Sequence, residues 1–140
     1  MIDTHTHLQF KVFEGKVDEV IDSANKAGVE KIIAVGADLE SSVKAVEIAQ
    51  KNQEVFASVG IHPHHLFNYQ SATKNYHLDL EEIERLLNHQ KVVAVGETGI
   101  DKYQYKITKY SKYQITNKFV NLQKEIFRLQ IELAIIHKKS

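Results

Sequence analysis

The sequence predicts an α/β fold in which parallel strands alternate with helices. Three short β-branched runs each end in glycine, amphipathic helical patterns fill the intervals, and the 140 residues suffice for one domain with a sizeable core. Strands in this order pair in parallel through right-handed crossovers. Four βα units make either a small open sheet or the first half of an eight-stranded barrel, and periodicity does not choose between the two.

Strands are expected at four places. The runs 31–36, 55–60 and 92–96 are apolar throughout, which is typical of strands that are buried on both faces of a parallel sheet. The opening segment, 1–7, is placed as a strand by its spacing rather than by its composition.

Four helices are expected to follow these strands. Gly28 is a good stop for the first, Asp38 can cap the second, and Asp79 followed by Glu82 resembles a capping box that opens the third. The fourth is the longest. The residues expected to face the core are Val17, Val20, Ile21 and Ala24; either Val43, Val46 and Ala49 or Ala45, Ile48 and Ala49; Ile83, Leu86 and Leu87; and Leu122, Ile126, Leu129, Leu133 and Ile136.

Composition excludes several classes of protein. Cysteine is absent, which rules out a disulfide framework, a zinc finger and a cysteine nucleophile. The N-terminus lacks the features of a signal peptide, and no apolar run approaches the roughly 20 residues that a membrane helix needs. We therefore expect a cytoplasmic protein that does not contact the membrane.

The net charge of zero hides an asymmetry along the chain. Residues 1–101 hold nine Lys and Arg against sixteen Asp and Glu, whereas residues 102–140 hold nine against two. The change begins at the Lys- and Tyr-rich segment 102–117, whose cations can neutralise phosphates and whose rings can stack on bases. A solvated loop with aromatic anchors is the alternative interpretation of this segment.

Polar side chains mark the first and last expected strands. Asp3, His5 and His7 share one face because side chains alternate along a strand. Two imidazoles in that arrangement can hold one metal ion. Glu97 follows the last strand and can bridge two cations in a two-metal site. The alternatives are ordinary histidines near an exposed terminus and a solvated acid in a loop.

A third polar group follows the strand 55–60. Pro63 fixes a turn that carries His62, His64 and His65, each of which suits a metal ligand, a phosphate binder or a surface residue. The carboxyl ends of parallel strands meet at one edge of the sheet. Three strand ends with metal- or phosphate-competent residues therefore predict a functional site there.

Five motifs occur in order along the chain: Asp3-Thr4-His5-Thr6-His7-Leu8, Gly60-Ile61-His62-Pro63-His64, Gly96-Glu97-Thr98-Gly99-Ile100-Asp101, Gln123-Lys124-Glu125-Ile126-Phe127 and Gln130-Ile131-Glu132-Leu133-Ala134. In this order they resemble the motifs of the TatD family of metal-dependent hydrolases. The resemblance implies the first half, four βα units, of a TIM-like (β/α)8 barrel of the amidohydrolase superfamily. It also implies hydrolysis of phosphodiester bonds in DNA, often as a 3′-to-5′ exonuclease, at a site with two divalent metal ions.

The same resemblance assigns roles to individual residues. His5 and His7 match the ligands of one metal ion, and Glu97 matches the carboxylate that bridges both ions. His62 and His64 match imidazoles that lie toward the substrate phosphate. Mixed His and carboxylate ligation suits Mg, Mn or Zn, so the residues do not fix the metal.

The chain also departs from the family pattern. In the family, two further histidines and an aspartate that is both ligand and general base follow the final helix. Residues 1–140 are therefore expected to form a partial domain that retains no general base, binds at most one ion weakly and is inactive alone. Its exposed sheet edges favour self-association or a complementary C-terminal fragment. Thr98 stands where Ile or Leu is usual, and segment 102–117 is longer than is common.

Two other functions stay open. Related barrels such as lactonases and amidases also begin with His-x-His, but they more often use a carbamylated lysine where this chain offers Glu97. A non-catalytic nucleic-acid-binding or assembly fragment would rely on segment 102–117. The residues do not distinguish DNA from RNA or short oligonucleotides as substrate.

Overall fold

The computed structural model describes residues 1–69, 75–102 and 116–140, and within them four parallel strands form one sheet. Their spatial order follows the chain, and every neighbouring pair is parallel, which confirms the predicted sheet. The strands are β1 (Ile2–Thr6), β2 (Lys31–Val35), β3 (Val55–Val59) and β4 (Val92–Val95).

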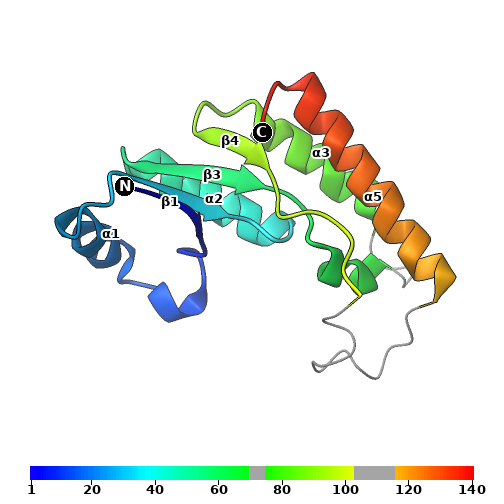
Figure 1. Ribbon diagram of the computed structural model, residues 1–140, viewed down its shortest axis with the longest axis horizontal. Coiled ribbons are helices and arrows are strands. Elements are labelled where there is room, and N and C mark those ends of the chain that lie inside the picture. Colours follow the sequence, from blue (N-terminus) through cyan, green and yellow to red (C-terminus); the bar gives the residue numbers. More distant parts are fainter. Residues whose placement is uncertain (70–74, 103–115) are drawn as a thin grey trace.

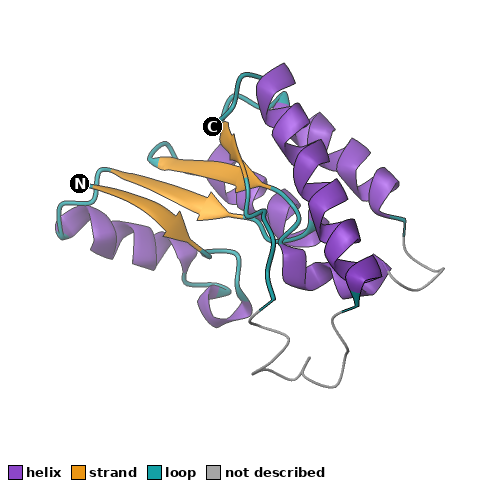
Figure 2. Cartoon of the chain, turned by 45° about the vertical axis from the view of Figure 1, so that its right-hand side comes forward, coloured by secondary structure: helices purple, strands orange, loops and turns teal. Residues whose placement is uncertain are grey.

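Helices follow the strands and lie along one side of the sheet (Figure 1, Figure 2). Right-handed crossovers between strands in sequential order bring successive helices to the same face. This single winding is the arrangement of a barrel rather than of a doubly wound sheet, in which the strand order reverses. The elements are α1 (Val17–Lys26), α2 (Leu39–Lys51), α3 (Tyr76–Leu87) and α5 (Asn117–Ile136), with 3-10 helices η1 (Lys11–Phe13) and η2 (Pro63–Tyr69).

The core lies between the sheet and the helices α1, α2, α3 and α5. Val55, Ala57 and Val59 of β3 are fully buried, as are Ala45 and Ala49 of α2, which packs on that strand. The small alanine side chains let the helix approach the strand closely, and burial of apolar surface contributes roughly 25 cal/mol per Å². β3 is thus a largely buried inner strand of the sheet.

The start of α2 matches the sequence prediction, whereas the start of α3 does not. The side chain of Asp38 accepts a hydrogen bond from the amide of Ser41 at 2.9 Å, and Oγ of Ser41 accepts one from the amide of Asp38 at 2.9 Å, which completes a capping box. The predicted capping box at Asp79 is wrong, because α3 begins one turn earlier, at Tyr76, with Asn75 as its cap. Asp79 lies inside the helix, where it accepts a hydrogen bond from Tyr69.

Two predicted core faces also need correction. The buried face of α2 combines residues from both proposed faces. Ala45, Val46 and Ala49 are buried, whereas Val43 is 37% exposed. Ile136 was expected in the core, but it is 67% exposed and lines an open groove between α3 and α5. Ile136 is the last residue of α5, where the helix no longer packs this side chain into the core.

The residues after α5 return to the outer edge of β4. The amide of Ser140 donates to the carbonyl of Val93 at 3.2 Å, and the amide of Val95 donates to the carbonyl of Ser140 at 2.9 Å. This pattern pairs Ser140 with Ala94 as in a parallel ladder. Among the described residues, the helices are too short or too polar to cross a membrane.

Candidate metal centre

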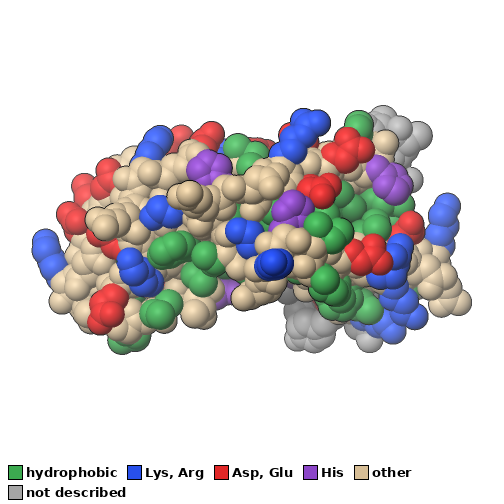
Figure 3. Space-filling model, turned by 90° about the horizontal axis from the view of Figure 1, so that it is seen from above, with side chains coloured by type: hydrophobic (Ala, Val, Ile, Leu, Met, Phe, Trp, Pro, Cys, Tyr) green, Lys and Arg blue, Asp and Glu red, His purple; other side chains and the backbone are tan. Residues whose placement is uncertain are grey.

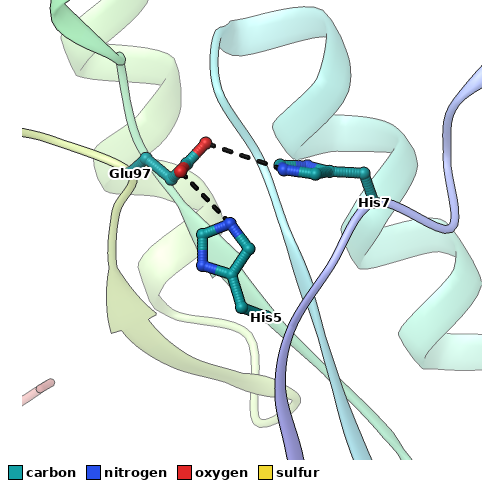
Figure 4. A group of neighbouring side chains, drawn as sticks. All are labelled: His5, His7 and Glu97. Atoms are coloured by element: carbon teal, nitrogen blue, oxygen red, sulfur yellow. Dashed lines mark ion pairs between the residues drawn. The ribbon is translucent and has the colours of Figure 1, made fainter.

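Side chains from the two outer strands of the sheet meet at its carboxyl edge. β1 and β4 are separated by two strands, or roughly 14 Å at about 4.8 Å per spacing. Nevertheless, Nε2 of His5 lies 3.2 Å from Oε1 of Glu97, and Nε2 of His7 lies 3.8 Å from Oε2 (Figure 4). The sheet therefore curves so that its first and last strands face one another, as strands do in a barrel.

The backbone after β4 carries Glu97 toward β1. The amide of Gly96 donates to the carbonyl of Val59 at 2.9 Å, and the amide of Glu97 donates to the carbonyl of Gly36 at 2.9 Å. The peptide bond between Gly96 and Glu97 is cis. The chain thus crosses the end of β3 to reach the end of β2, which shortens the distance that the Glu97 side chain spans.

Glycines at the strand ends allow close contacts there, Gly36 with α2 and Gly60 with the crossing segment. A Cβ atom on Gly36 would lie 2.2 Å from Oγ of Ser42, and one on Gly60 would lie 2.9 Å from the carbonyl carbon of Gly96. Ser42 itself is fully buried and accepts a hydrogen bond from the amide of Gly60 at 3.1 Å. A larger residue at Gly60 would push the crossing segment away, and one at Gly36 would push α2 away from the end of β2.

The ring of His7 is oriented by the neighbouring strand. Its Nδ1 atom lies 2.9 Å from the carbonyl oxygen of Val35, which only accepts hydrogen bonds, so Nδ1 carries the hydrogen. The Nε2 lone pair then points toward Glu97, the arrangement found where a histidine binds a metal ion. The side chain of Gln9 donates to the same carbonyl at 2.6 Å. The sequence analysis did not single out Gln9 as a partner of this carbonyl. The only indication in the sequence is that Gln9 stands two residues after His7.

The donor set suits a divalent cation. Ligand atoms of His5, His7 and Glu97 all lie within 4.8 Å of one another. Ligands about 2.1 Å from an ion in tetrahedral or octahedral geometry lie roughly 3–3.5 Å apart, so small side-chain shifts bring all three into range. Asp3 is not part of this cluster; its carboxylate accepts a hydrogen bond from the amide of His5 at 3.1 Å.

The histidine turn lies beside this cluster. His62 is partly buried, and its Nδ1 atom accepts a hydrogen bond from the amide of His64 at 3.1 Å, so the ring hydrogen sits on Nε2. Burial lowers the pKa of His62 below its ordinary value, while the nearby carboxylates of Glu97 and Asp101 oppose that shift and His7 adds to it. His62 is therefore a neutral hydrogen-bond donor at neutral pH.

The other histidines of the turn lie in a row. The rings of His62 and His64 are 4.7 Å apart, those of His64 and His65 are 4.1 Å apart, and Nδ1 of His65 lies 3.6 Å from Oδ2 of Asp38. The row thus continues from the cluster to the start of α2.

Residues outside the cluster have other partners or lie beyond the described part of the chain. His137 pairs with Glu84 at 3.2 Å rather than with the site. Most of the Lys- and Tyr-rich segment 102–117 lies outside the described residues, so its predicted role is not tested. On the face shown in Figure 3, basic and acidic side chains are interspersed, so the charge asymmetry along the sequence does not divide this face by sign.

Known proteins resemble the chain in both sequence and fold. A family described as TatD related DNase matches residues 2–140. An uncharacterized metal-dependent hydrolase, YabD, of Bacillus subtilis is 34% identical over 96% of this chain and 46% of its own length. A 3′-5′ ssDNA/RNA exonuclease TatD of Edwardsiella piscicida is 36% identical over 72% of this chain and 37% of its own.

A solved structure extends the similarity to three dimensions. The crystal structure of YJJV, a TatD homologue from Escherichia coli, superposes with a TM-score of 0.78 at 28% identity. The match covers 99% of this chain and 48% of that one. The chain therefore spans about half the length of the relatives that it matches, and its four βα units correspond to half of their fold.

Proposed function

The chain belongs to the TatD family of metal-dependent hydrolases, and on that premise we propose that His5, His7 and Glu97 hold a divalent metal ion for phosphodiester cleavage. The observation that carries the proposal is the Nδ1 contact of His7 with the Val35 carbonyl. It directs the free nitrogen of His7 toward a carboxylate from the opposite edge of the sheet. The three side chains thus share one small space instead of pointing separately into solvent.

Each residue of the site then has a defined task. A bound divalent ion supplies Lewis acidity toward a phosphate oxygen and acidifies water. His5 and His7 donate nitrogen ligands, and Glu97 supplies negative charge that offsets the charge of the cation. His62 donates its Nε2 hydrogen to a phosphate oxygen, because the His64 amide occupies its Nδ1. His64 lies next to it and contacts the same substrate group.

We propose that a complete site of this kind holds two ions, Mg, Mn or Zn, with Glu97 bridging them. The resemblance assigns the remaining ligands and the general-base aspartate to the half of the relatives that this chain does not match. With three donors, the 140 residues alone bind at most one ion weakly and lack robust nuclease activity.

The proposed substrate is single-stranded DNA or a short oligonucleotide. Relatives from Edwardsiella piscicida and Escherichia coli are named 3′-5′ ssDNA/RNA exonucleases. These names support a nucleic-acid substrate but do not distinguish DNA from RNA. For segment 102–117 both interpretations stay open, contact with phosphates and bases or a solvated loop with aromatic anchors. The cytoplasmic location also remains a prediction from the sequence.

We further propose that protein covers the sheet face opposite the helices, as a complementary half of the barrel or a second copy of this chain. This face holds a largely apolar hollow of about 340 Å³ lined by Ile2, Ile33 and Phe56, among others. Ile2 is 58% exposed. Apolar surface beside an unpaired strand edge favours association.

Calorimetric titration of the 140-residue chain with Mn²⁺ and Zn²⁺ tests the metal site. We expect at most one ion per chain, with binding abolished in Glu97→Gln and His7→Ala. His77→Ala serves as the matched control, because His77 is an exposed histidine of α3. Binding that survives Glu97→Gln would overturn the assigned ligands.

A nuclease assay tests the proposed division of the active site. Labelled single-stranded DNA is incubated with Mn²⁺ and the chain, with and without the complementary half of a relative. We expect cleavage only when both halves are present. Robust cleavage by this chain alone would contradict the proposal.

A further inference from the structure

We propose that α5 positions the metal-site loops through two buried glutamines, with Gln130 setting the relative placement of Glu97 and His62. The inference rests on the proposed metal site and deepens it. Gln123 and Gln130 are both fully buried. They are seven residues apart, so they lie on one face of the helix about 10 Å apart.

Gln130 holds two loops at once. Its Oε1 accepts a hydrogen bond from the amide of Ile61 at 2.7 Å, and its Nε2 donates to the carbonyl of Ile61 at 3.1 Å. The same Nε2 donates to Oγ1 of Thr98 at 2.6 Å. Ile61 precedes His62 and Thr98 follows Glu97, so one carboxamide links the two segments that carry site residues.

Gln123 repeats this pairing two turns earlier. Its Oε1 accepts from the amide of Asp101 at 3.2 Å, and its Nε2 donates to the carbonyl of Asp101 at 2.9 Å. Each carboxamide therefore imitates a strand partner for one residue of backbone. Together they hold both ends of the segment 98–101 against α5.

Packing alone does not explain these glutamines. They interrupt an otherwise apolar stripe of α5. A leucine would fill the same space at no polar cost, whereas a buried amide must find hydrogen-bond partners. The neighbouring backbone is also shaped around Gln130: a Cβ atom on Gly60 would lie 2.8 Å from its Oε1. The hydrogen bonds end on loop backbone beside the site, which assigns Gln130 a positioning role.

Hydrogen exchange tests the role without any metal. Gln130→Met keeps the size of the side chain and removes its hydrogen bonds, whereas the control Ile126→Ala removes buried apolar volume one turn away. The reporters are the amides of His62 and Glu97, which donate to the carbonyls of Ala37 and Gly36. We expect Gln130→Met to lose about tenfold or more protection at these two amides relative to the β3 amides, and Ile126→Ala to lose protection uniformly.

Metal affinity connects the role to function. We expect Gln130→Met to weaken Mn²⁺ or Zn²⁺ binding by about tenfold or more, the range typical of residues that orient metal ligands. Ile126→Ala should bind as the native chain does. Thr98→Val, which loses a single hydrogen bond and keeps its shape, should show a smaller effect in the same direction and serves if Gln130→Met does not fold.

The two arms separate this inference from the proposed function. Native-like exchange at His62 and Glu97 in both Gln130→Met and Thr98→Val would overturn the positioning role, even if the native chain binds metal. A native chain that binds no metal would overturn the proposed function, while the exchange measurement would still decide whether Gln130 positions the loops.

Discussion

The amide of Glu97 donates a hydrogen bond to the carbonyl of Gly36 at 2.9 Å, although these residues follow β4 and β2, which are not neighbours in the sheet. This contact passes over the end of β3. It brings the candidate metal-bridging carboxylate within reach of histidines from the far edge. The geometry of the site therefore depends on how closely three strand ends pack.

Gly60→Ala should disturb that packing. Its Cβ would lie 2.9 Å from the carbonyl carbon of Gly96, and overpacking of this kind costs about 1–3 kcal/mol of the free energy of unfolding. Urea denaturation measures the loss, and Mn²⁺ titration should show weaker binding. Gly15→Ala is the control: it meets no atoms within 4 Å but has a positive φ, so it should lower stability without changing metal affinity.

Asp38→Ala should destabilise the start of α2. The substitution removes the side-chain acceptor of the Ser41 amide, and loss of such a cap costs about 0.5–2 kcal/mol. Urea denaturation at neutral pH measures the change, with Ser23→Ala at an exposed position of α1 as the control. Equal stability of the two variants would contradict a capping role.

Tyr69 should make the protein sensitive to alkaline pH. Burial, together with its hydrogen bond to Asp79, raises the pKa of Tyr69 above its ordinary value of 10.0. The folded state then holds the proton more tightly than the unfolded chain, so this contribution to stability is complete below about pH 10 and is lost as the pH rises further. Tyr69→Phe should show a shallower loss of unfolding free energy above that pH, and an unchanged slope would count against the assignment.

His62 should make the protein sensitive to acid. Burial lowers the pKa of His62 below its ordinary value of 6.5, so the unfolded chain takes up a proton more readily than the folded protein. Stability from this group is therefore present above about pH 6.5 and declines as the pH falls toward the lowered value. His62→Gln should flatten this part of the stability profile, whereas His77→Gln should leave it unchanged.

Much of the fold could be predicted because its signals are local. Apolar runs that end in glycine located β2, β3 and β4, and Asp38 was identified as a helix cap from its residue type and position. The start of α3 was missed because Asn75 is as good a cap as Asp79, and only the packing of Tyr76 and Leu80 decides between them.

The candidate site was predictable only in part. Its residue types and their strand-end positions indicated His5, His7 and Glu97, but the distances among them depend on sheet curvature and on the path over β3. Gln130 belongs to one of the motifs that carry the resemblance, but its residue type did not indicate its role, because a glutamine in a helix is ordinarily a surface residue. The hydroxyl of Thr98, a departure from the family pattern, acquires a purpose only when its contact with Gln130 is seen.

The pairing of Ser140 with Ala94 has a consequence for anything that joins the sheet at β4. Ser140 and Ala94 line the same hollow on the face away from the helices. A strand that runs on from this position inherits its alignment from a single residue pair, because side chains alternate strictly along a strand. A shift of one residue in this pairing would turn the side chain of Ser140 from the barrel axis to the helical layer, so one ladder contact fixes which side chains at this edge face the interior.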